Sequence, residues 1–437
     1  MFIVLSLLGL LSQAAYPPIR YLFGLSDHGI MWFLDSYAVL ASSDADRAGV
    51  YPDASNPYDV FQRSHKYSDW WFLLGQLGLT RADNFLVGGI WVIGFLIAEF
   101  STVVPRSLGE AIWLALLVTS PPVMLGILRA NNDLVIFTLL AVALVALRKM
   151  TVTRVGIVLA TLALATGLKF YPVVAAGAVL LIPESRWRYR TAGLAALISL
   201  GVVVSVWPQI ARGTFHIEPQ IHTFGSRIAL LDLGLEARLA AGLSPFLFPL
   251  MSGLLIRVHP QPKFDLKDAT LRSLHHAMAM GAALLVICFL AGTNYAYRFI
   301  FALWVAPWCW SHRESRSVLR LGVWLLPIAL WQHGALCAAT ALWFPDLLPE
   351  SMIASFAAGV WPPSPSPGFS LRCWAHGGCT SDLPCSTNSG RADGPENGDT
   401  LPRTNFYPTD SRIRIRADAR LRFSNKKTDE LIARRSF

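Results

Sequence analysis

Charge is scarce in this chain. Of its 437 residues only 15% are charged, whereas 54% are hydrophobic. A soluble domain carries about 25% charged residues, so the composition argues against a soluble fold. Several of the apolar runs reach roughly 17–25 residues, the length that an α-helix needs to cross a bilayer, and others are shorter. Because these runs do not alternate between apolar and polar positions, they favour helices over a β-barrel.

Signatures of nucleotide and metal binding are also missing. The sequence has no GxxxxGK[ST] phosphate loop, no GxGxxG motif after a strand and no HExxH zinc motif. Three of its six cysteines, Cys288, Cys309 and Cys337, lie in apolar runs, where we interpret them as core residues. The other three lack the spacing of a zinc knuckle or ribbon. We therefore predict no metal, no cofactor and no nucleotide-sugar donor.

The net charge of +9 does not indicate a nucleic-acid partner. The basic residues form short clusters between apolar runs, and no basic stripe lies on a soluble module. These clusters are at 148–154, 186–190 and 313–320. Lys and Arg concentrate in the cytoplasmic loops of membrane proteins, so all three clusters are predicted on the cytoplasmic side.

The apolar runs predict an all-α, polytopic transmembrane helix bundle. The predicted spans are 84–104, 108–128, 133–147, 155–168, 172–182, 191–208, 239–256, 274–291, 298–311 and 319–343, with an abbreviated one at 352–361. The stretch 155–182 is predicted as two short segments separated at Lys169 and Pro172, since only this division leaves every basic cluster on one side. A single kinked helix is the alternative.

The two ends of the chain differ from this pattern. Residues 1–15 are apolar but short for a span, and we interpret them as a clipped first transmembrane helix; a signal peptide and a short anchor are the alternatives. Residues 362–437 are rich in Pro, Ser, Gly and Arg without helical periodicity. We interpret them as a disordered or out-of-frame tail, which leaves 1–361 as the transmembrane domain.

A long polar segment, 16–82, is predicted as the first outer loop. Within it, 27–48 has apolar residues at helical spacing and is predicted to form an amphipathic helix at the membrane interface, with Ser26 as N-cap and Gly49 as C′ residue. Asp35 lies on the polar face, where a low-dielectric surface can raise the pKa of the carboxyl and suit it to general-base chemistry. A solvated helix face is the alternative, and the competing carboxylates are Asp44, Asp46, Asp53 and Asp59.

Polar motifs of mixed chemistry are predicted on the outer side. The segment 129–133, Arg-Ala-Asn-Asn-Asp, offers an arginine for phosphate, and amide and carboxylate groups for sugar hydroxyls or for capping by Asn132 or Asp133. Lys169 lies alone between two apolar stretches, where it can neutralise a lipid phosphate or extend to the interface. An arginine with flanking tyrosines at 295–298 can hold a phosphate or stack a sugar ring; an aromatic belt with an arginine that extends to the interface is the alternative.

The order of these motifs resembles a known family. Along residues 1–360 the motifs are Asp35-x-Tyr37, Asn56-Pro57-Tyr58-Asp59, Arg129-x-Asn131-Asn132-Asp133, Leu168-Lys169-x-x-Pro172 and Asn294-Tyr295-x-Tyr297-Arg298. The chain is similar to the integral-membrane glycosyltransferases of the GT-C superfamily, in particular to glycosyltransferase family 87. That family includes mannosyltransferases that depend on polyprenyl-phosphate mannose.

The resemblance implies an enzyme that transfers a hexose, with mannose the expected sugar, from a polyprenyl-phosphate donor to a lipid or glycan acceptor on the outer face of a bacterial inner membrane. By analogy Asp35 is the catalytic base, transfer inverts the anomeric centre, and the partners are this donor, the acceptor and membrane lipids. The donor phosphate is expected to contact Lys169, Arg129 and Arg298. The residues expected to bind sugar or acceptor are Asn131, Asn132, Asp133, Tyr171, Tyr295, Tyr297, His216 and His222.

A transporter or flippase of a lipid or polar solute is the alternative function, because broken helices and buried charges suit both classes. A transporter is expected to show internal repeats and charges near the membrane midplane. The chain shows no convincing repeat, and its specific charges are predicted at one interface. A purely structural membrane protein is the third interpretation.

Overall fold

The computed structural model describes residues 32–52, 55–149, 151–181, 185–211, 223–224, 269–290, 294–315 and 319–343. All of them lie in the first of the chain's two units, Met1–Ser366. Several predictions fall outside the described residues. They concern the apolar segment 1–15, Ser26, Asp53, the spans at 239–256 and 352–361, His216, His222 and the tail 362–437.

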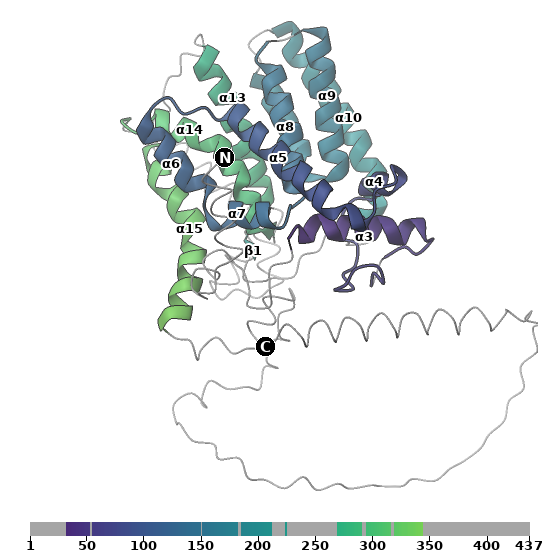
Figure 1. Cartoon of the computed structure of the whole chain (residues 1–437). Coiled ribbons are helices and arrows are strands. Elements are labelled where there is room, and N and C mark those ends of the chain that lie inside the picture. The colour runs from purple at the N-terminus through teal and green to yellow at the C-terminus, as the bar shows by residue number, and fades with distance from the viewer. Residues whose placement is uncertain are drawn as a thin grey trace, which may run out of the picture. The chain divides into compact units, whose positions relative to one another are not determined.

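Helices make up most of the described structure (Figure 1). The α-helices are α3 (Leu34–Arg47), α4 (Leu73–Gln76), α5 (Asn84–Thr102), α6 (Leu108–Val118), α7 (Pro121–Leu128), α8 (Asp133–Leu147), α9 (Val152–Leu168), α10 (Ser185–Ala211), α13 (Ala269–Leu290), α14 (Ala302–Ser311) and α15 (Leu319–Trp343). The 3-10 helices are η1 (Asp69–Phe72), η2 (Arg81–Asp83), η3 (Tyr171–Leu181) and η4 (Ala296–Phe301). Strands β1 (Thr223–Phe224) and β2 (Asn294–Tyr295) form a short antiparallel pair. The predicted helical class is confirmed for this part of the chain.

Three helices among the described residues are long and apolar enough to cross a membrane: Arg81–Thr102, Arg188–Gln209 and Leu271–Leu290. Helices α6 and α7 make a fourth span if they count as one, but they are bent by 59° at the break between them. The continuous span predicted at 108–128 is therefore wrong. Pro121 starts α7 and holds the preceding Ser120 in an extended conformation, so the helix cannot run through.

The division of 155–182 into two segments is confirmed. Helix α9 ends at Leu168, Lys169 is extended, and the chain continues as η3 from Tyr171. A close contact fixes this end of α9, because a Cβ on Gly167 would lie 2.3 Å from the Trp70 ring. Only glycine allows the indole of the outer loop to pack this closely against the helix.

Helix α3 lies crosswise to the upright helices α8, α9 and α10 (Figure 1). It ends as predicted at Gly49, whose φ of 73° is the left-handed conformation of a C′ glycine, and Val50 donates a hydrogen bond back to the Ala45 carbonyl. The solvated helix face, which was the alternative interpretation for Asp35, is wrong. Every residue from Asp35 to Ser43 is buried, because the loop before η1 and helix α4 pack against this helix.

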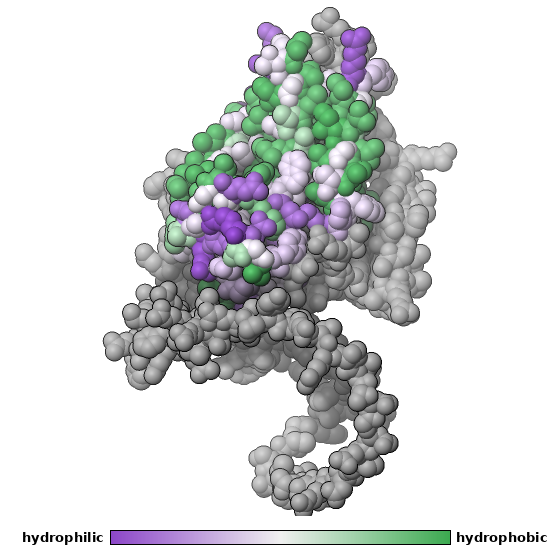
Figure 2. Space-filling model, turned by 90° about the vertical axis from the view of Figure 1, so that its right-hand side faces the viewer, coloured by the Kyte–Doolittle hydropathy of each residue, from purple (hydrophilic) through white to green (hydrophobic). Residues whose placement is uncertain are grey.

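Apolar side chains face outward over a broad zone of the molecule (Figure 2). On the face shown, this zone separates polar residues at one end from a larger polar area nearer the other. On α5 the exposed apolar residues are Phe85, Leu86, Ile90, Ile93, Ile97 and Phe100. Such a surface suits contact with lipid. The basic cluster that starts at Arg148 and the polar motif that ends at Asp133 lie at opposite ends of α8.

Candidate functional site

The first part of the candidate site is an ion pair between Asp35 and Arg129. Asp35 lies in the first turn of α3, and Arg129 follows the last residue of α7. Their elements are joined by backbone hydrogen bonds of 2.9 Å, from the Asp35 N–H to the Arg129 carbonyl and from the Phe33 N–H to the Leu128 carbonyl. The guanidinium then donates through Nη2 to Asp35 Oδ1 over 2.6 Å, and through Nε to Oδ1 over 3.0 Å and to Oδ2 over 3.1 Å. The carboxylate is buried, with 2% of its surface exposed.

The environment of Asp35 keeps its carboxyl ionised. Burial by itself would raise the pKa, but the charge and hydrogen bonds of Arg129, a hydrogen bond from Asn131 and the charge of Arg63 bring the pKa below its ordinary value. The predicted increase of this pKa is therefore wrong, because the sequence did not reveal that two guanidinium groups lie close to the carboxylate. At neutral pH Asp35 is an acceptor of protons and hydrogen bonds.

The second part of the site surrounds Asp133, the first residue of α8. Lys169 Nζ contacts Asp133 Oδ1, and the Tyr171 hydroxyl donates to the same oxygen over 2.7 Å. The Arg298 Nε lies 3.7 Å from Asp133 Oδ2, and the guanidinium stacks over the Tyr171 ring at 4.8 Å. The end of α9, the start of η3 and η4 thus converge on the start of α8.

An aromatic stack beneath the second part explains why these ends meet. Phe137 lies one helical turn after Asp133, and Phe301 lies three residues after Arg298. The rings of Phe137 and Phe301 are stacked with centroids 6.1 Å apart, and Trp304 stacks on Phe137 at 4.1 Å. Packing of these buried rings therefore brings the carboxylate of Asp133 and the guanidinium of Arg298 to the same level of the bundle.

The second part carries an excess positive charge. Two cations, Lys169 and Arg298, share the single carboxylate of Asp133. Arg298 Nε is buried and has no hydrogen-bond partner in the described structure, and Nη1 reaches only the weakly accepting Cys288 thiol at 3.9 Å. A buried guanidinium without full compensation is costly. The arrangement suits the binding of an anion, which supplies both the missing charge and the missing acceptors.

Asn131 connects the two parts. Its Nδ2 donates to Asp35 Oδ2 over 2.5 Å, and its Oδ1 accepts from the Asp133 N–H over 2.9 Å. The predicted capping of α8 by Asn132 or Asp133 is therefore wrong, because the amide of Asn131 takes this role and Asn132 makes no side-chain cap. Tyr297 is within electrostatic range of both Asp35 and Asp133.

The structure thus brings together most of the residues that the sequence singled out. They are Asp35, Arg129, Asn131, Asp133, Lys169, Tyr171, Tyr295, Tyr297 and Arg298. Arg129 contacts Asp35, whereas Lys169 and Arg298 contact Asp133. Asn132 is buried, and its amide has no hydrogen-bond partner among the described residues.

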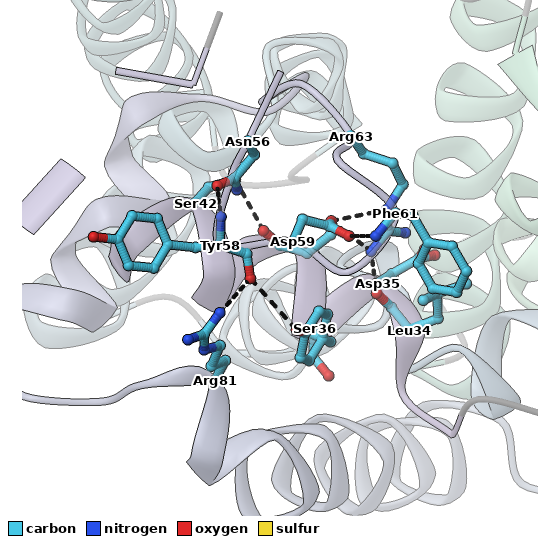
Figure 3. Close-up of polar contacts among 12 residues, drawn as sticks. Leu34, Asp35, Ser36, Ser42, Asn56, Tyr58, Asp59, Phe61, Arg63 and Arg81 are labelled. Carbon is cyan, nitrogen blue, oxygen red and sulfur yellow. Dashed lines mark hydrogen bonds and ion pairs between the residues drawn. The ribbon is translucent and has the colours of Figure 1, made fainter. Parts of the chain in front are cut away.

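Sequence reasoning missed Arg63 and Tyr67 and assigned Asp59 a different role. Asp59, considered as a competing base, forms an ion pair of 2.8 Å with Arg63 Nη2 (Figure 3). Tyr67 is half-buried near Asp35, and desolvation of its hydroxyl, followed by the charge of Asp35, raises the pKa of that hydroxyl. The i,i+4 spacing of Asp59 and Arg63 was a usable signal for the ion pair, but nothing in the sequence placed this pair beside Asp35.

No metal centre is evident in the ranges that the structure describes, where no three His, Cys, Asp or Glu side chains gather as ligands. A metal-free and cofactor-free site stays a prediction. Comparisons of the chain with family models, curated proteins and solved structures give no match. The geometry of the site sets an ionised carboxylate beside a buried group with excess positive charge.

Proposed function

We propose that this protein is a membrane glycosyltransferase. It transfers a hexose, with mannose the expected sugar, from a polyprenyl-phosphate donor to a hydroxyl of a lipid or glycan acceptor. The observation that carries this proposal is the pairing of two neighbouring features, the excess cation around Asp133 and the ionised carboxylate of Asp35, joined through Asn131. The first suits a lipid-linked phosphate, and the second suits a hydroxyl that must lose its proton.

The proposed reaction divides the work between these two features. Asp35 accepts the proton of the acceptor hydroxyl while the hydroxyl oxygen forms a bond to the anomeric carbon. The bond between that carbon and the phosphate oxygen breaks on the opposite face, which inverts the anomeric centre. The leaving polyprenyl phosphate takes up the electron pair, and its increased negative charge is stabilised by Lys169 and Arg298. Arg129 keeps Asp35 oriented, as its bidentate contact indicates.

The surroundings of the site suit a lipid-linked donor. Non-helical backbone at membrane depth occurs where it lines a cavity or is buried in protein. Here Lys169 is extended between α9 and η3, and Ala130 after α7 has a positive φ. The site and the basic cluster at Arg148 lie at opposite ends of α8. By the positive-inside rule, this arrangement supports a site on the outer face of the membrane. We propose a multi-pass protein of a bacterial inner membrane.

A transporter is the second candidate function. The break of 59° between α6 and α7 is of the kind found in transporters with discontinuous helices. The charged residues of the site lie at helix ends, however, and not in the middle of the spans. This position favours a transferase.

A transfer assay tests the proposal. Membranes that contain the chain receive radiolabelled polyprenyl-phosphate mannose and cell lipid extract, and matched membranes without the chain are the control. Label in a new lipid or glycan, only where the chain is present, is the expected result. Solute flux in sealed vesicles without any transfer would favour the transporter instead.

A further inference from the structure

Arg63 is held in one orientation by a buried carboxylate. Asp59, of which 2% is exposed, accepts from Arg63 Nε over 2.9 Å with Oδ2 and from the Phe61 N–H over 2.8 Å with Oδ1. Both carboxylate oxygens are therefore occupied within their own loop. Asp59 has no direct contact with Asp133 or with the cations around it among the described interactions, so its role is to fix the Arg63 guanidinium.

The fixed guanidinium reaches the start of α3. Arg63 Nη2 donates to the Leu34 carbonyl over 3.3 Å, one residue before Asp35 (Figure 3). The charge of Arg63 also acts on the Asp35 carboxylate. Arg63 thus contacts the backbone that carries Asp35, while Arg129 contacts its side chain.

Other contacts tie the same loop to α3. The Tyr37 hydroxyl donates to the Tyr58 carbonyl over 3.4 Å, and Asn56 Nδ2 donates to Ser42 Oγ over 3.4 Å. These bonds are long, and both lie further along the helix than Asp35. The ion pair of Asp59 and Arg63 is the strongest part of this attachment and the part closest to the site.

We propose that Arg63, oriented by Asp59, is a positioning residue for Asp35. It holds the first turn of α3 through the Leu34 carbonyl and keeps a second guanidinium beside the carboxylate. This inference rests on the proposed function insofar as Asp35 is the base. A small displacement of a reacting group lowers the rate strongly, so release of this turn is expected to slow transfer without weakening donor binding at Lys169 and Arg298.

A double-mutant cycle tests the contact without any need for activity. The midpoint of thermal unfolding is measured for the full chain in detergent with Arg63→Gln, Asp35→Asn and both changes. If Arg63 acts on Asp35, the decrease caused by Arg63→Gln is smaller by about 2 °C or more when Asp35 is already Asn. Arg47→Gln is the control, because Arg47 lies at the far end of α3 and pairs with Asp44 at 2.5 Å. Additive effects of Arg63→Gln and Asp35→Asn would overturn the proposal.

The pH dependence of transfer supplies the second test. The charged and titratable groups that act on or around Asp35 come from the loop (Arg63, Tyr67), the end of α7 (Arg129), the end of α9 (Lys169) and η4 (Tyr297). Loss of the Arg63 charge is expected to move the acidic limb of the rate profile to higher pH and to lower kcat roughly tenfold, with the KM for the donor unchanged.

Two further variants separate a positioning role from a general loss of structure. Asp59→Asn and Arg63→Lys both keep the positive charge at position 63, so each is expected to keep the acidic limb in place while kcat falls. An Arg63→Gln enzyme that loses activity equally at every pH would show that Arg63 supports the fold only. If the unsubstituted protein shows no transfer, the proposed function fails, and the thermal cycle alone decides whether Arg63 orients Asp35.

Discussion

Arg129 and Asp35 are 94 positions apart in the sequence and form a bidentate ion pair at the junction of α7 and α3. Two backbone hydrogen bonds also join the same two segments. The side-chain contact therefore does not stand alone, since the backbone already places the two residues opposite each other. This junction positions an ionised carboxylate 2.5 Å from the Asn131 amide nitrogen. The amide oxygen of Asn131 accepts a hydrogen bond from the Asp133 N–H, so Asn131 links Asp35 to the cationic group around Asp133.

The ion pair predicts a loss of stability in acid. The pKa of Asp35 in the folded protein lies below its ordinary value of 3.8, so the folded state holds the proton less tightly than the unfolded state. Stability from this group is then fully present above about pH 4 and is lost as the pH falls through the folded pKa. We expect the difference in unfolding midpoint between the unsubstituted protein and Asp35→Asn to narrow from pH 7 towards pH 3. A difference that stays constant over this range would contradict the assignment.

Arg298 is predicted to contribute to donor binding. Its guanidinium has a buried Nε without a hydrogen-bond partner in the described structure, and a hydrogen bond to a charged group contributes about 1.5–3 kcal/mol. Arg298→Gln should therefore raise the KM for the polyprenyl-phosphate donor roughly 10- to 100-fold. Initial rates over a range of donor concentrations measure this effect. Arg313→Gln is the control, because Arg313 pairs with the exposed Glu314; equal KM values for the two variants would argue against phosphate binding by Arg298.

The contact between α9 and the outer loop depends on Gly167. A Cβ at this position would lie 2.3 Å from the Trp70 ring, so Gly167→Ala should destabilise the protein by about 1–3 kcal/mol through overpacking. Gly156 in the same helix faces open space, since a Cβ there would meet no atom within 4 Å, and Gly156→Ala should stabilise the protein by roughly 0.5–1 kcal/mol. Thermal unfolding of the two variants in detergent measures both changes. Similar midpoints would show that Trp70 moves away at little cost.

A cysteine-labelling experiment tests the proposed orientation of the protein in the membrane. Lys66 lies on the loop near the site and Arg148 at the opposite end of α8, and both are exposed. In a chain whose native cysteines are replaced by alanine, Lys66→Cys should react with an impermeant maleimide added to intact cells. Arg148→Cys should react only after the membrane is opened. Labelling of both sites from the same side would contradict the proposed topology.

The sequence predicted the helices and most of the site's members, but it did not predict how those members pair. Apolar runs and the proline at position 172 located α8, α9 and the break after Leu168 because these signals are local. The partner of Asp35 is 94 positions away, and the burial of α3 depends on a loop that packs over it. Such long-range contacts leave no periodic trace in a single sequence. This is why the pKa of Asp35 was predicted in the wrong direction and why Arg63 was overlooked.

The rate of sugar transfer with Asp35→Asn beside the unsubstituted protein tests most directly whether Asp35 is the base. Radiolabelled polyprenyl-phosphate mannose is supplied to membranes that hold equal amounts of each, and the label transferred to acceptor is measured over time. A positioned general base accelerates a reaction about 10²- to 10⁴-fold, so a decrease of at least about 100-fold is predicted. Equal rates for the two proteins would show that Asp35 is not the general base of the transfer.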